Sequence, residues 1–395
     1  MRRRDFLQGT LAASVLGPLS KGCAFEAGGR YDDFEIAFDG KVVVIGAGAA
    51  GLAAGYLLDR YGIEYEILEA ADQIGGRVRR VEGFADFPLD VGAEWLHDAP
   101  TMLAQLVDDR RVDESVELVP YSPDEIRAWN GRRLRRMHWV SPYYTEYKFR
   151  TTTWFGFLER FFAPASTGRL RLGTEVVHVD TTGTQARLTT AAGETVEADR
   201  VLVTVPLKVL QEGRIAFTPA LDDEREQALG RVEVPAGLKV FFDFERRFYP
   251  DLVLDGGPLR SGGLDKLFYD AAFRKPSERH VLGLFWVSND AAPVVAQDDE
   301  TIAARLLEDL DRMFDGRASR FHRGHVVQNW SAEPFIRGAY STRFTGHRSR
   351  TMDTLRTPHD GRTFFAGEAL SDAHQSTVHG AMLSAYDAVE RLLAG

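Results

Sequence analysis

The chain has one cysteine among its 395 residues, so no disulfide can form within it. Basic residues are fewer than acidic ones: the chain has 48 Lys and Arg against 58 Asp and Glu, which gives a net charge of −10. That balance disfavours nucleic acid and anionic membrane surfaces as partners. The apolar stretch Leu11 to Leu19 is far shorter than the roughly 20 residues of a membrane-spanning helix. With 44% hydrophobic and 27% charged residues, the composition is that of a globular protein long enough for two domains.

The first residues are typical of an export signal. An arginine pair, Arg3-Arg4, precedes a Phe-Leu pair and a short apolar stretch, and this order resembles a twin-arginine signal. We therefore expect residues 1–22 to be a signal peptide, residues 23–40 to be a linker and the mature protein to be periplasmic. A lipid anchor at Cys23 is an alternative, although the residues before it fit such a cleavage site poorly.

A strand, a helix and a second strand are predicted between residues 41 and 69. The run from Lys41 to Ile45 is rich in β-branched residues and is typical of a buried strand. The Ala-rich segment after it is typical of a helix that ends at Gly62. Residues 64–68 form a second apolar run. This order predicts a βαβ unit.

The turn of this unit has the glycine spacing of a dinucleotide site. Gly46 would make the tight turn, Gly48 would let the backbone approach a pyrophosphate, and Gly51 would let the helix pack on the strand. The helix N-terminus offers free N–H groups and a partial positive charge to the phosphates. Glu69, 23 residues after Gly46, falls where an acid accepts the ribose hydroxyls. We therefore predict a bound dinucleotide.

Seven further sequence blocks follow this unit in a fixed order. With the first one they read VVVIGAGAAGLAAGYLL, ILEAADQIGGR, LDVGAEWLH, VLVTVPLKVL, GLKVFFDFERRFY, NWSAEPFIRGAYST, FFAGEA and STVHGAMLSA. Together they resemble the flavin-containing amine oxidases, the family of the monoamine oxidases, polyamine oxidases and lysine-specific histone demethylases. Eight blocks in family order are far more specific than any one of them. The resemblance implies FAD, rather than a nicotinamide, as the cofactor.

The resemblance implies an α/β fold in which a Rossmann-like FAD-binding domain is interleaved with a substrate domain made of a mixed sheet and helices. The FAD-binding domain would comprise residues 41–95, 168–238 and 340–395, and the substrate domain residues 96–167 and 239–339. The segment 96–167 departs from the family, because it is shorter than the helical insert of the mammalian monoamine oxidases. It is rich in aromatic residues, and we expect most of them to be core. The short segment would leave the pocket more open or require a partner subunit to complete it.

Local patterns predict several elements of these domains. Strand-like alternation at 175–179, 186–190 and 195–198 indicates a small antiparallel meander, which a buried strand at 200–205 follows. Residues 299–314 have the periodicity of an amphipathic helix that packs on a core. At the C-terminus, a short strand that ends in a glycine and an acid precedes an apolar helix from about Gly380.

Lys239 lies inside an apolar strand that runs to Phe244. A buried lysine is costly without a partner, and the chain has only seven lysines. The resemblance matches Lys239 to the lysine that holds a water beside the reactive nitrogen of the flavin, where it would assist reoxidation by dioxygen or hydrolysis of the imine. The alternative is a lysine on an edge strand that points to solvent.

The resemblance also implies an aromatic wall over the flavin. Trp330 and Tyr340 match this region, and Tyr340 would orient the amine. The opposite wall falls at Thr377, so the cage is one-sided, as in the polyamine oxidases and demethylases. Ala339 stands where the mammalian monoamine oxidases have the cysteine that bonds the flavin, so FAD would be non-covalent.

The cofactor-binding residues that we predict join the glycine turn to positions that match the family. In the family layout, Val176 would meet the adenine side, the backbone N–H of Val378 the pyrimidine edge of the flavin, and Glu368 the ribityl or pyrophosphate region. The full set is Gly46, Gly48, Ala49, Ala50, Gly51, Glu69, Ala70, Gly76, Arg77, Gly92, Ala93, Glu94, Trp95, Val176, Gly367, Glu368, Thr377 and Val378. No spacing of ligand residues indicates a metal, and His97, His374 and His379 are expected to be packed or capping residues.

These patterns predict a flavin-dependent amine oxidase. A small primary or secondary amine would be oxidised to an imine, which hydrolyses to a carbonyl product, while dioxygen or another acceptor takes the electrons; with dioxygen the product is hydrogen peroxide. One alternative is an amino-acid oxidase, which needs an arginine for the substrate carboxylate, and Arg127, Arg132 and Arg337 are candidates. Others are a related flavin desaturase or dehydrogenase and a non-catalytic flavin-binding accessory subunit.

Overall fold

The computed structural model describes residues 36–109, 111–137, 146–256 and 266–394. The predicted export signal, Cys23 and most of the predicted linker lie outside the described residues, as do three of the aromatic residues of the short segment, Trp139, Tyr143 and Tyr144. Within the described part of the chain, none of the helices has both the length and the apolar composition needed to cross a membrane.

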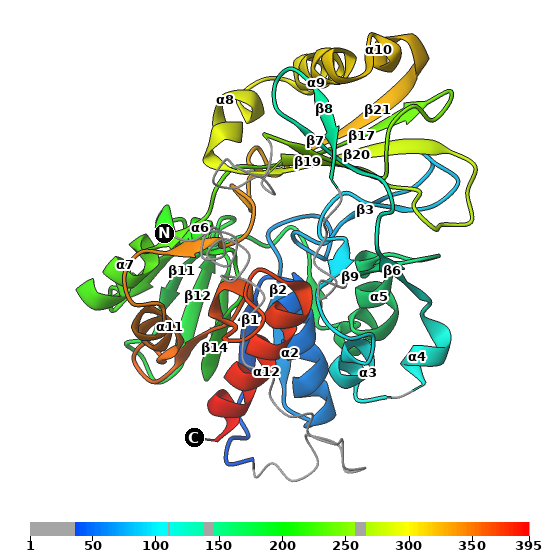
Figure 1. Ribbon diagram of the computed structural model, residues 1–395. Helices are drawn as coiled ribbons and strands as arrows, with labels where there is room; N and C mark the ends of the chain where they lie inside the picture. Colours follow the sequence, from blue (N-terminus) through cyan, green and yellow to red (C-terminus); the bar gives the residue numbers. More distant parts are fainter. Residues whose placement is uncertain (1–35, 110, 138–145, 257–265, 395) are drawn as a thin grey trace, which may run out of the picture.

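A five-stranded parallel sheet in the order β10-β2-β1-β14-β23 organises the lower half of the molecule in Figure 1. Its strands are β10 (Leu170–Arg171), β2 (Tyr65–Leu68), β1 (Val42–Ile45), β14 (Arg200–Val203) and β23 (Thr363–Phe365). Helices α2 (Ala49–Arg60) and α12 (Val378–Leu393) lie side by side on one face. The βαβ prediction is therefore confirmed, and α2 ends before Gly62, which has the left-handed φ of +68°.

The two faces of this sheet enter different cores, as alternation along a strand requires. Val42 and Val44 of β1 pack with α2 and α12, whereas Val43 and Ile45 pack against a second, four-stranded sheet. That sheet has the order β13-β12-β11-β15, with β11 (Val176–Asp180), β12 (Ala186–Thr190), β13 (Thr195–Ala198) and β15 (Ala216–Thr218). Its antiparallel pairs β11·β12 and β12·β13 confirm the predicted meander.

A seven-stranded mixed sheet forms the upper half of the molecule (Figure 1). In order, its strands are β21 (His322–Asn329), β17 (Gly237–Phe244), β20 (His280–Val287), β19 (Lys266–Asp270), β18 (Leu252–Asp255), β7 (Ile126–Trp129) and β8 (Leu134–Arg136). Helix α9 (Asp299–Phe314) buries Ile302, Leu306 and Leu310 in the core of this half, which confirms the predicted amphipathic helix. An Asp298 side chain caps its N-terminus.

The short segment 96–167 contributes to both halves of the molecule. Its strands β7 and β8 extend the seven-stranded sheet, whereas helices α3 (Met102–Val107) and α5 (Trp154–Phe161) pack in the core of α2 and α12. Trp154 and Phe157 are fully buried there, which confirms that most of the described aromatic residues of this segment are core. The predicted division into domains stays a prediction, but part of 96–167 is packed with helix α2.

Smaller elements complete the fold. A three-stranded sheet joins β5 (Trp95–Leu96), β9 (Glu146–Phe149) and β6 (Leu118–Tyr121), and two ribbons pair β3 (Arg80–Val81) with β4 (Leu89–Asp90) and β16 (Val232–Glu233) with β22 (Arg343–Phe344). The remaining helices are α4 (Val112–Ser115), α6 (Leu207–Gln211), α7 (Asp223–Gly230), α8 (Ala292–Val295), α10 (Arg317–Phe321) and α11 (Arg348–Arg356), with short 3₁₀ turns at Ala163–Ser166, Asn289–Ala291 and Glu368–Leu370.

Candidate functional site

In the glycine turn between β1 and α2, Gly51 and Gly48 are glycine for two different physical reasons. A Cβ on Gly51 would lie 1.9 Å from the carbonyl oxygen of Gly46, so the fold itself requires glycine there. A Cβ on Gly48 would meet nothing closer than the carbonyl oxygen of Gly75 at 3.9 Å, and Gly48 has extended backbone that any residue adopts. Gly48 also begins α2 without a side-chain cap. The chain alone therefore does not explain Gly48, whereas a pyrophosphate at this helix end does.

The acid after β2 is held by the same turn. Glu69 is 8% exposed, and its Oε2 and Oε1 accept hydrogen bonds from the backbone N–H groups of Ala47 (2.5 Å) and Ala71 (2.9 Å). Burial raises the pKa of Glu69, although these backbone donors lower it in part. A carboxylate has about four lone-pair sites, so two remain for other donors such as ribose hydroxyls. Together with the open face at Gly48, this geometry fits a dinucleotide.

We expect Gly48→Ala to weaken FAD binding at least about tenfold, or about 1.4 kcal/mol, because its methyl group would occupy the backbone surface that approaches the pyrophosphate. The stability of the cofactor-free protein should change by no more than about 0.5 kcal/mol, since nothing in the chain contacts that methyl group. Gly51→Ala is the matched contrast and should destabilise the cofactor-free protein. Urea unfolding and FAD titration measure the two effects, and unchanged FAD affinity in Gly48→Ala would contradict this assignment.

Arg77 connects three segments that are far apart in the sequence. Its Nη1 donates to the backbone oxygen of Ala339 (2.8 Å) and to Oε1 of Glu368 (3.0 Å). Glu368 also accepts hydrogen bonds from the backbone N–H and the hydroxyl of Ser341. Gly367, just before it, has a φ of +153°, which only glycine adopts readily. The predicted cofactor residues Arg77, Gly367 and Glu368 are thus brought together beside the segment that carries Tyr340.

Of the aromatic residues predicted for the substrate side, Trp330 is buried and Tyr340 is half-buried. Trp330 donates its Nε1–H to the backbone oxygen of Val91 (3.0 Å), and the Arg79 guanidinium lies 5.1 Å from its ring centre. The ring of Tyr340 is stacked on Phe285, with 6.4 Å between ring centres. Thr377 caps α12, because its hydroxyl oxygen accepts from the backbone N–H of Gly380 (2.9 Å). Its place as the second cage wall stays a prediction.

The other predicted cofactor residues lie on several elements of the fold. Val378 is the first residue of α12, and Ala49 and Ala50 are the first residues of α2. Ala93 donates its backbone N–H to the carbonyl oxygen of Arg77 (3.1 Å). Val176, at the start of β11, is buried in the core between the two lower sheets. Ala70 and Gly76 lie in the loop after β2, and the cofactor roles of all these residues stay predictions.

Lys239 is buried, as the interpretation of it as a charged residue inside an apolar strand predicts. It lies on β17, which pairs with β20 on one side and β21 on the other, and it is only 3% exposed. The interpretation as a solvent-facing edge lysine is therefore wrong. Nζ donates to the backbone oxygens of Asp90 (2.7 Å) and Gly92 (3.0 Å) and to Glu94 Oε2 (2.7 Å). An ammonium has three donors, so a water held by Lys239 would have to replace one of these acceptors.

Glu94 is the centre of a buried charge cluster. Its two oxygens contact Lys239 Nζ at 2.7 Å and Lys148 Nζ at 2.6 Å, and the Tyr269 hydroxyl donates to Oε2. Burial alone would raise the pKa of Glu94, but the charges of Lys148 and Lys239 outweigh it and lower the pKa to about 2. Burial in turn lowers the pKa of Lys239. One carboxylate therefore serves two ammonium groups.

Asp90 and Lys275 extend this cluster. Burial, reinforced by the negative charge of Glu94, raises the pKa of Asp90 to about 8, while its Oδ1 accepts the backbone N–H of Trp154 (3.1 Å). Burial, reinforced by the charge of Lys148, lowers the pKa of Lys275 to about 8, and its Nζ donates to the backbone oxygen of Phe149 (2.9 Å).

The sequence interpretation missed Lys148, Lys275, Asp90 and Tyr269. Lys148 was within reach of the argument used for Lys239, because it stands between Tyr147 and Phe149 in a short strand. The other residues gave no comparable signal, since their partners come from distant segments. Glu94 was predicted as a cofactor residue, and its ion pairs were not foreseen.

The arginines proposed for a substrate carboxylate lie at the surface. Arg127 pairs with Glu125 (2.6 Å), Arg337 with Glu212 (2.9 Å), and Arg132 is exposed in the turn between β7 and β8. None of these three side chains is buried, so none supplies the desolvated arginine that an amino-acid oxidase would need.

Comparison with known families adds a decisive match. A model described as flavin containing amine oxidoreductase matches residues 155–393, and an NAD(P)-binding Rossmann-like domain matches residues 44–109. The chain belongs to the flavin-containing amine oxidoreductase family. Membership implies FAD as the cofactor and confirms the predicted family, and the fold is the α/β amine oxidase fold with a Rossmann-like domain and a mixed-sheet domain.

Individual relatives are distant. Human lysine-specific histone demethylase 2 is 25% identical over 90% of this chain and 53% of its own length, so the chain spans about half the length of that relative. Polyamine oxidase 3 of Oryza sativa subsp. japonica is 25% identical over 89% of this chain and 88% of its own length. A putrescine oxidase A394C mutant and the cyclohexylamine oxidase of Brevibacterium oxydans IH-35A share the fold, with TM-scores of 0.74 and 0.75 at 17% and 16% identity; each match covers 90% of this chain and 99% of the other.

Proposed function

We propose that this protein oxidises a primary or secondary amine to an imine, with dioxygen as the electron acceptor and hydrogen peroxide as a product. The carrying observation is the buried Glu94–Lys239–Lys148 cluster, in which Glu94 comes from the matched Rossmann-like segment and Lys239 from the matched amine oxidoreductase segment. The relatives named polyamine oxidase, putrescine oxidase and cyclohexylamine oxidase support an aliphatic amine as the substrate class.

The residues that would hold FAD are those around the two helix N-termini. Gly48 and the first turn of α2 would face the pyrophosphate, Glu69 the ribose, and Arg77 with Glu368 the linking region. Ala339 has no sulfur to bond the flavin, so FAD would be bound non-covalently and would be released into solution when the protein is unfolded. Bound FAD supplies the electrophile that accepts a hydride from the carbon beside the amine nitrogen, and it passes the electrons to dioxygen.

The protein itself would position the amine and supply the field. The two buried ammonium groups around one carboxylate disfavour a further positive charge nearby, such as a protonated substrate amine. The neutral amine is therefore the form that would bind productively. The ring of Tyr340 would form one wall of the amine pocket and orient the amine. A neutral amine needs no strong side-chain base, and we assign none.

Lys239 would act through its positive charge. Its three donors already bind Asp90, Gly92 and Glu94, and the fixed ammonium would stabilise negative charge that develops as dioxygen is reduced. Its contacts to the backbone of Asp90 and Gly92 would also fix the strand end along which the flavin is expected to lie.

Peroxide release from a panel of amines, polyamines and amino acids tests this function. We expect release with amines. Release with amino acids alone would instead support the amino-acid oxidase, and a yellow protein that releases none and is not reduced by any amine would support the accessory subunit.

We also propose that the protein is exported by the twin-arginine route to the periplasm. Arg3-Arg4 and the apolar stretch support this, and the route suits a protein that binds its cofactor before transport. The double variant Arg3→Lys and Arg4→Lys should leave the protein in the cytoplasm, whereas Arg30→Lys should not. Equal periplasmic amounts of the double variant and the unchanged protein would contradict this route.

A further inference from the structure

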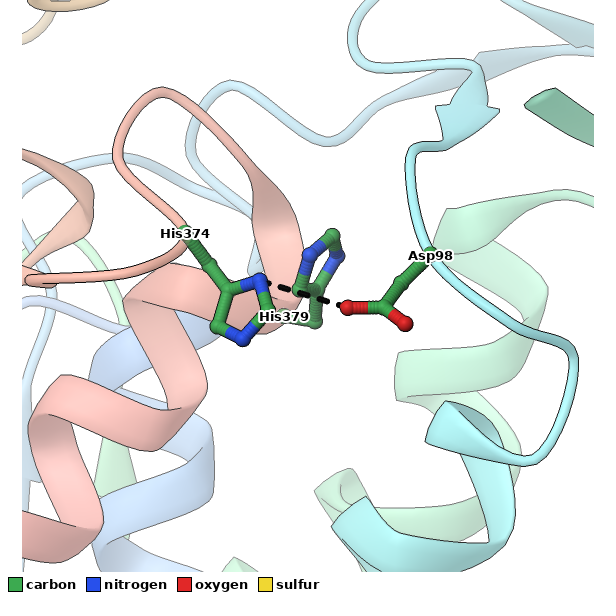
Figure 2. Close-up of side chains that lie close together, drawn as sticks. All are labelled: Asp98, His374 and His379. Atoms are coloured by element: carbon green, nitrogen blue, oxygen red, sulfur yellow. Dashed lines mark ion pairs between the residues drawn. The ribbon is translucent and has the colours of Figure 1, made fainter. Parts of the chain in front are cut away.

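Asp98, His374 and His379 converge at the start of α12, outside the residues used above (Figure 2). Asp98 follows β5, His374 lies in the loop before α12, and His379 is the second residue of that helix. One ligand atom from each lies within 4.8 Å of the others, and His374 Nδ1 is 3.3 Å from Asp98 Oδ2. The two imidazole rings are 4.9 Å apart. Two imidazoles and one carboxylate are thus aimed at one point.

His379 is the unusual member of this triad. It is 0% exposed, and neither of its ring nitrogens has a hydrogen-bond partner among the described residues. A buried polar group without a partner is unfavourable, because it has lost its hydrogen bonds to water. Imidazole nitrogen is a common metal ligand, so a bound cation would give this buried ring the partner that it lacks among the described residues.

The loop between the two histidines is fixed on the helix. The Thr377 hydroxyl donates to the backbone oxygen of His374 (2.7 Å) while it accepts from Gly380, and His374 donates its backbone N–H to Ser371 Oγ (3.3 Å). A Cβ on Gly380 would lie 1.8 Å from the His374 oxygen, so only glycine allows this approach. The backbone of His374 is therefore held in a fixed position next to the first turn of α12, which carries His379.

We propose that Asp98, His374 and His379 form a binding site for a divalent first-row transition metal such as Zn²⁺. Two histidines and one carboxylate are a known protein ligand set for such ions and leave positions open to water. Ligands on a tetrahedral zinc lie about 3.3 Å apart at bond lengths of about 2.0–2.1 Å. The side chains of Asp98 and His374 are about 29% and 28% exposed, so both can rotate to close onto the ion around the fixed His379.

The partial positive charge at the N-terminus of α12 disfavours a cation, and the Asp98 carboxylate opposes that effect. His97 is not counted as a ligand, because its Nδ1 is engaged by Glu146 at 2.6 Å. The proposal goes beyond the expectation from the sequence that His374 and His379 are packed or capping residues.

The test is equilibrium dialysis of the full-length protein, as purified, against Zn²⁺, with metal content measured by plasma mass spectrometry. We expect about one Zn²⁺ per chain at saturation, and His374→Ala and Asp98→Ala should each weaken binding at least roughly tenfold. Both residues are partly exposed, so the variants should fold. Co²⁺ in place of Zn²⁺ should give a visible ligand-field spectrum that both variants lose.

The chain offers a matched control in a second histidine pair. His322 and His325 on β21 have stacked rings 5.5 Å apart and also contain nitrogens without hydrogen-bond partners. The double variant His322→Gln and His325→Gln should keep the Zn²⁺ stoichiometry. If binding is lost in this control but kept in His374→Ala, or if the unchanged protein retains no Zn²⁺, the proposal is overturned.

Discussion

Glu94→Gln is expected to lower the free energy of unfolding by about 3–5 kcal/mol. The substitution removes the carboxylate that contacts both Lys148 and Lys239, and it leaves two ammonium groups in a buried, aromatic environment. The backbone oxygens that accept from Lys239 cannot replace the lost charge. Urea unfolding of the cofactor-free variant and the cofactor-free parent measures the difference.

Two further variants show whether charge is the cause. Lys148→Met removes one ammonium but leaves the Glu94–Lys239 pair, so it should cost clearly less than Glu94→Gln. The double variant should be more stable than the sum of the two losses predicts, by about 0.5–3 kcal/mol of coupling. Glu66→Gln, at a partly exposed pair with Lys41, should cost no more than about 1 kcal/mol. If Glu94→Gln lowers the free energy of unfolding by no more than Glu66→Gln does, the charge cluster does not stabilise the fold as described.

The same carboxylate should make stability depend on acidic pH. The pKa of Glu94 is lowered from 4.5 to about 2 in the folded protein, so the folded state binds fewer protons than the unfolded state between these values. The stabilisation is therefore complete above pH 4.5 and is lost as the pH falls towards 2. The stability gap between the parent and Glu94→Gln should narrow across this window, as unfolding at a series of pH values would show.

Lys239→Met should reduce turnover by about 10²–10³-fold while the protein stays folded and yellow. The reason is that the fixed ammonium beside the expected flavin site is lost, whereas Glu94 keeps Lys148 as its partner. Stopped-flow measurement should separate flavin reduction by the amine from reoxidation by dioxygen, and the reoxidation rate should fall most.

Lys266→Met is the matched control for Lys239→Met. Lys266 is also a paired, partly buried lysine of the seven-stranded sheet, with Asp255 at 2.7 Å and Asp309 at 3.1 Å, but it lies outside the Glu94 cluster. Its rates should match those of the parent. Parental rates in Lys239→Met as well would remove Lys239 from the mechanism.

The fold was predictable where one strong local signal fixed each element. The β-branched run 42–45, the glycine turn and the Ala-rich helix after it form a βαβ unit whose parts are neighbours in the sequence. The meander and α9 were predictable for the same reason, because their periodicity is local. The segment 96–167 was harder, since its helices and strands pack in different halves of the molecule, and no local pattern states which.

The candidate site was predictable only where a residue is unusual in its own neighbourhood. Lys239 among aromatic and aliphatic residues signals a buried charge, and its burial is confirmed. The identity of its partner depends on the placement of the loop 90–94 against β17, which the spacing along the chain does not reveal. The convergence of Asp98 with His374 and His379 was not predicted for the same reason, because most of the chain separates Asp98 from the two histidines.

Anaerobic mixing of the purified protein with an aliphatic diamine or polyamine tests the central claim most directly. The account predicts a yellow protein whose flavin absorbance bleaches on mixing and returns when oxygen is admitted, with hydrogen peroxide released. A protein that is colourless, and remains so after incubation with FAD, would contradict it.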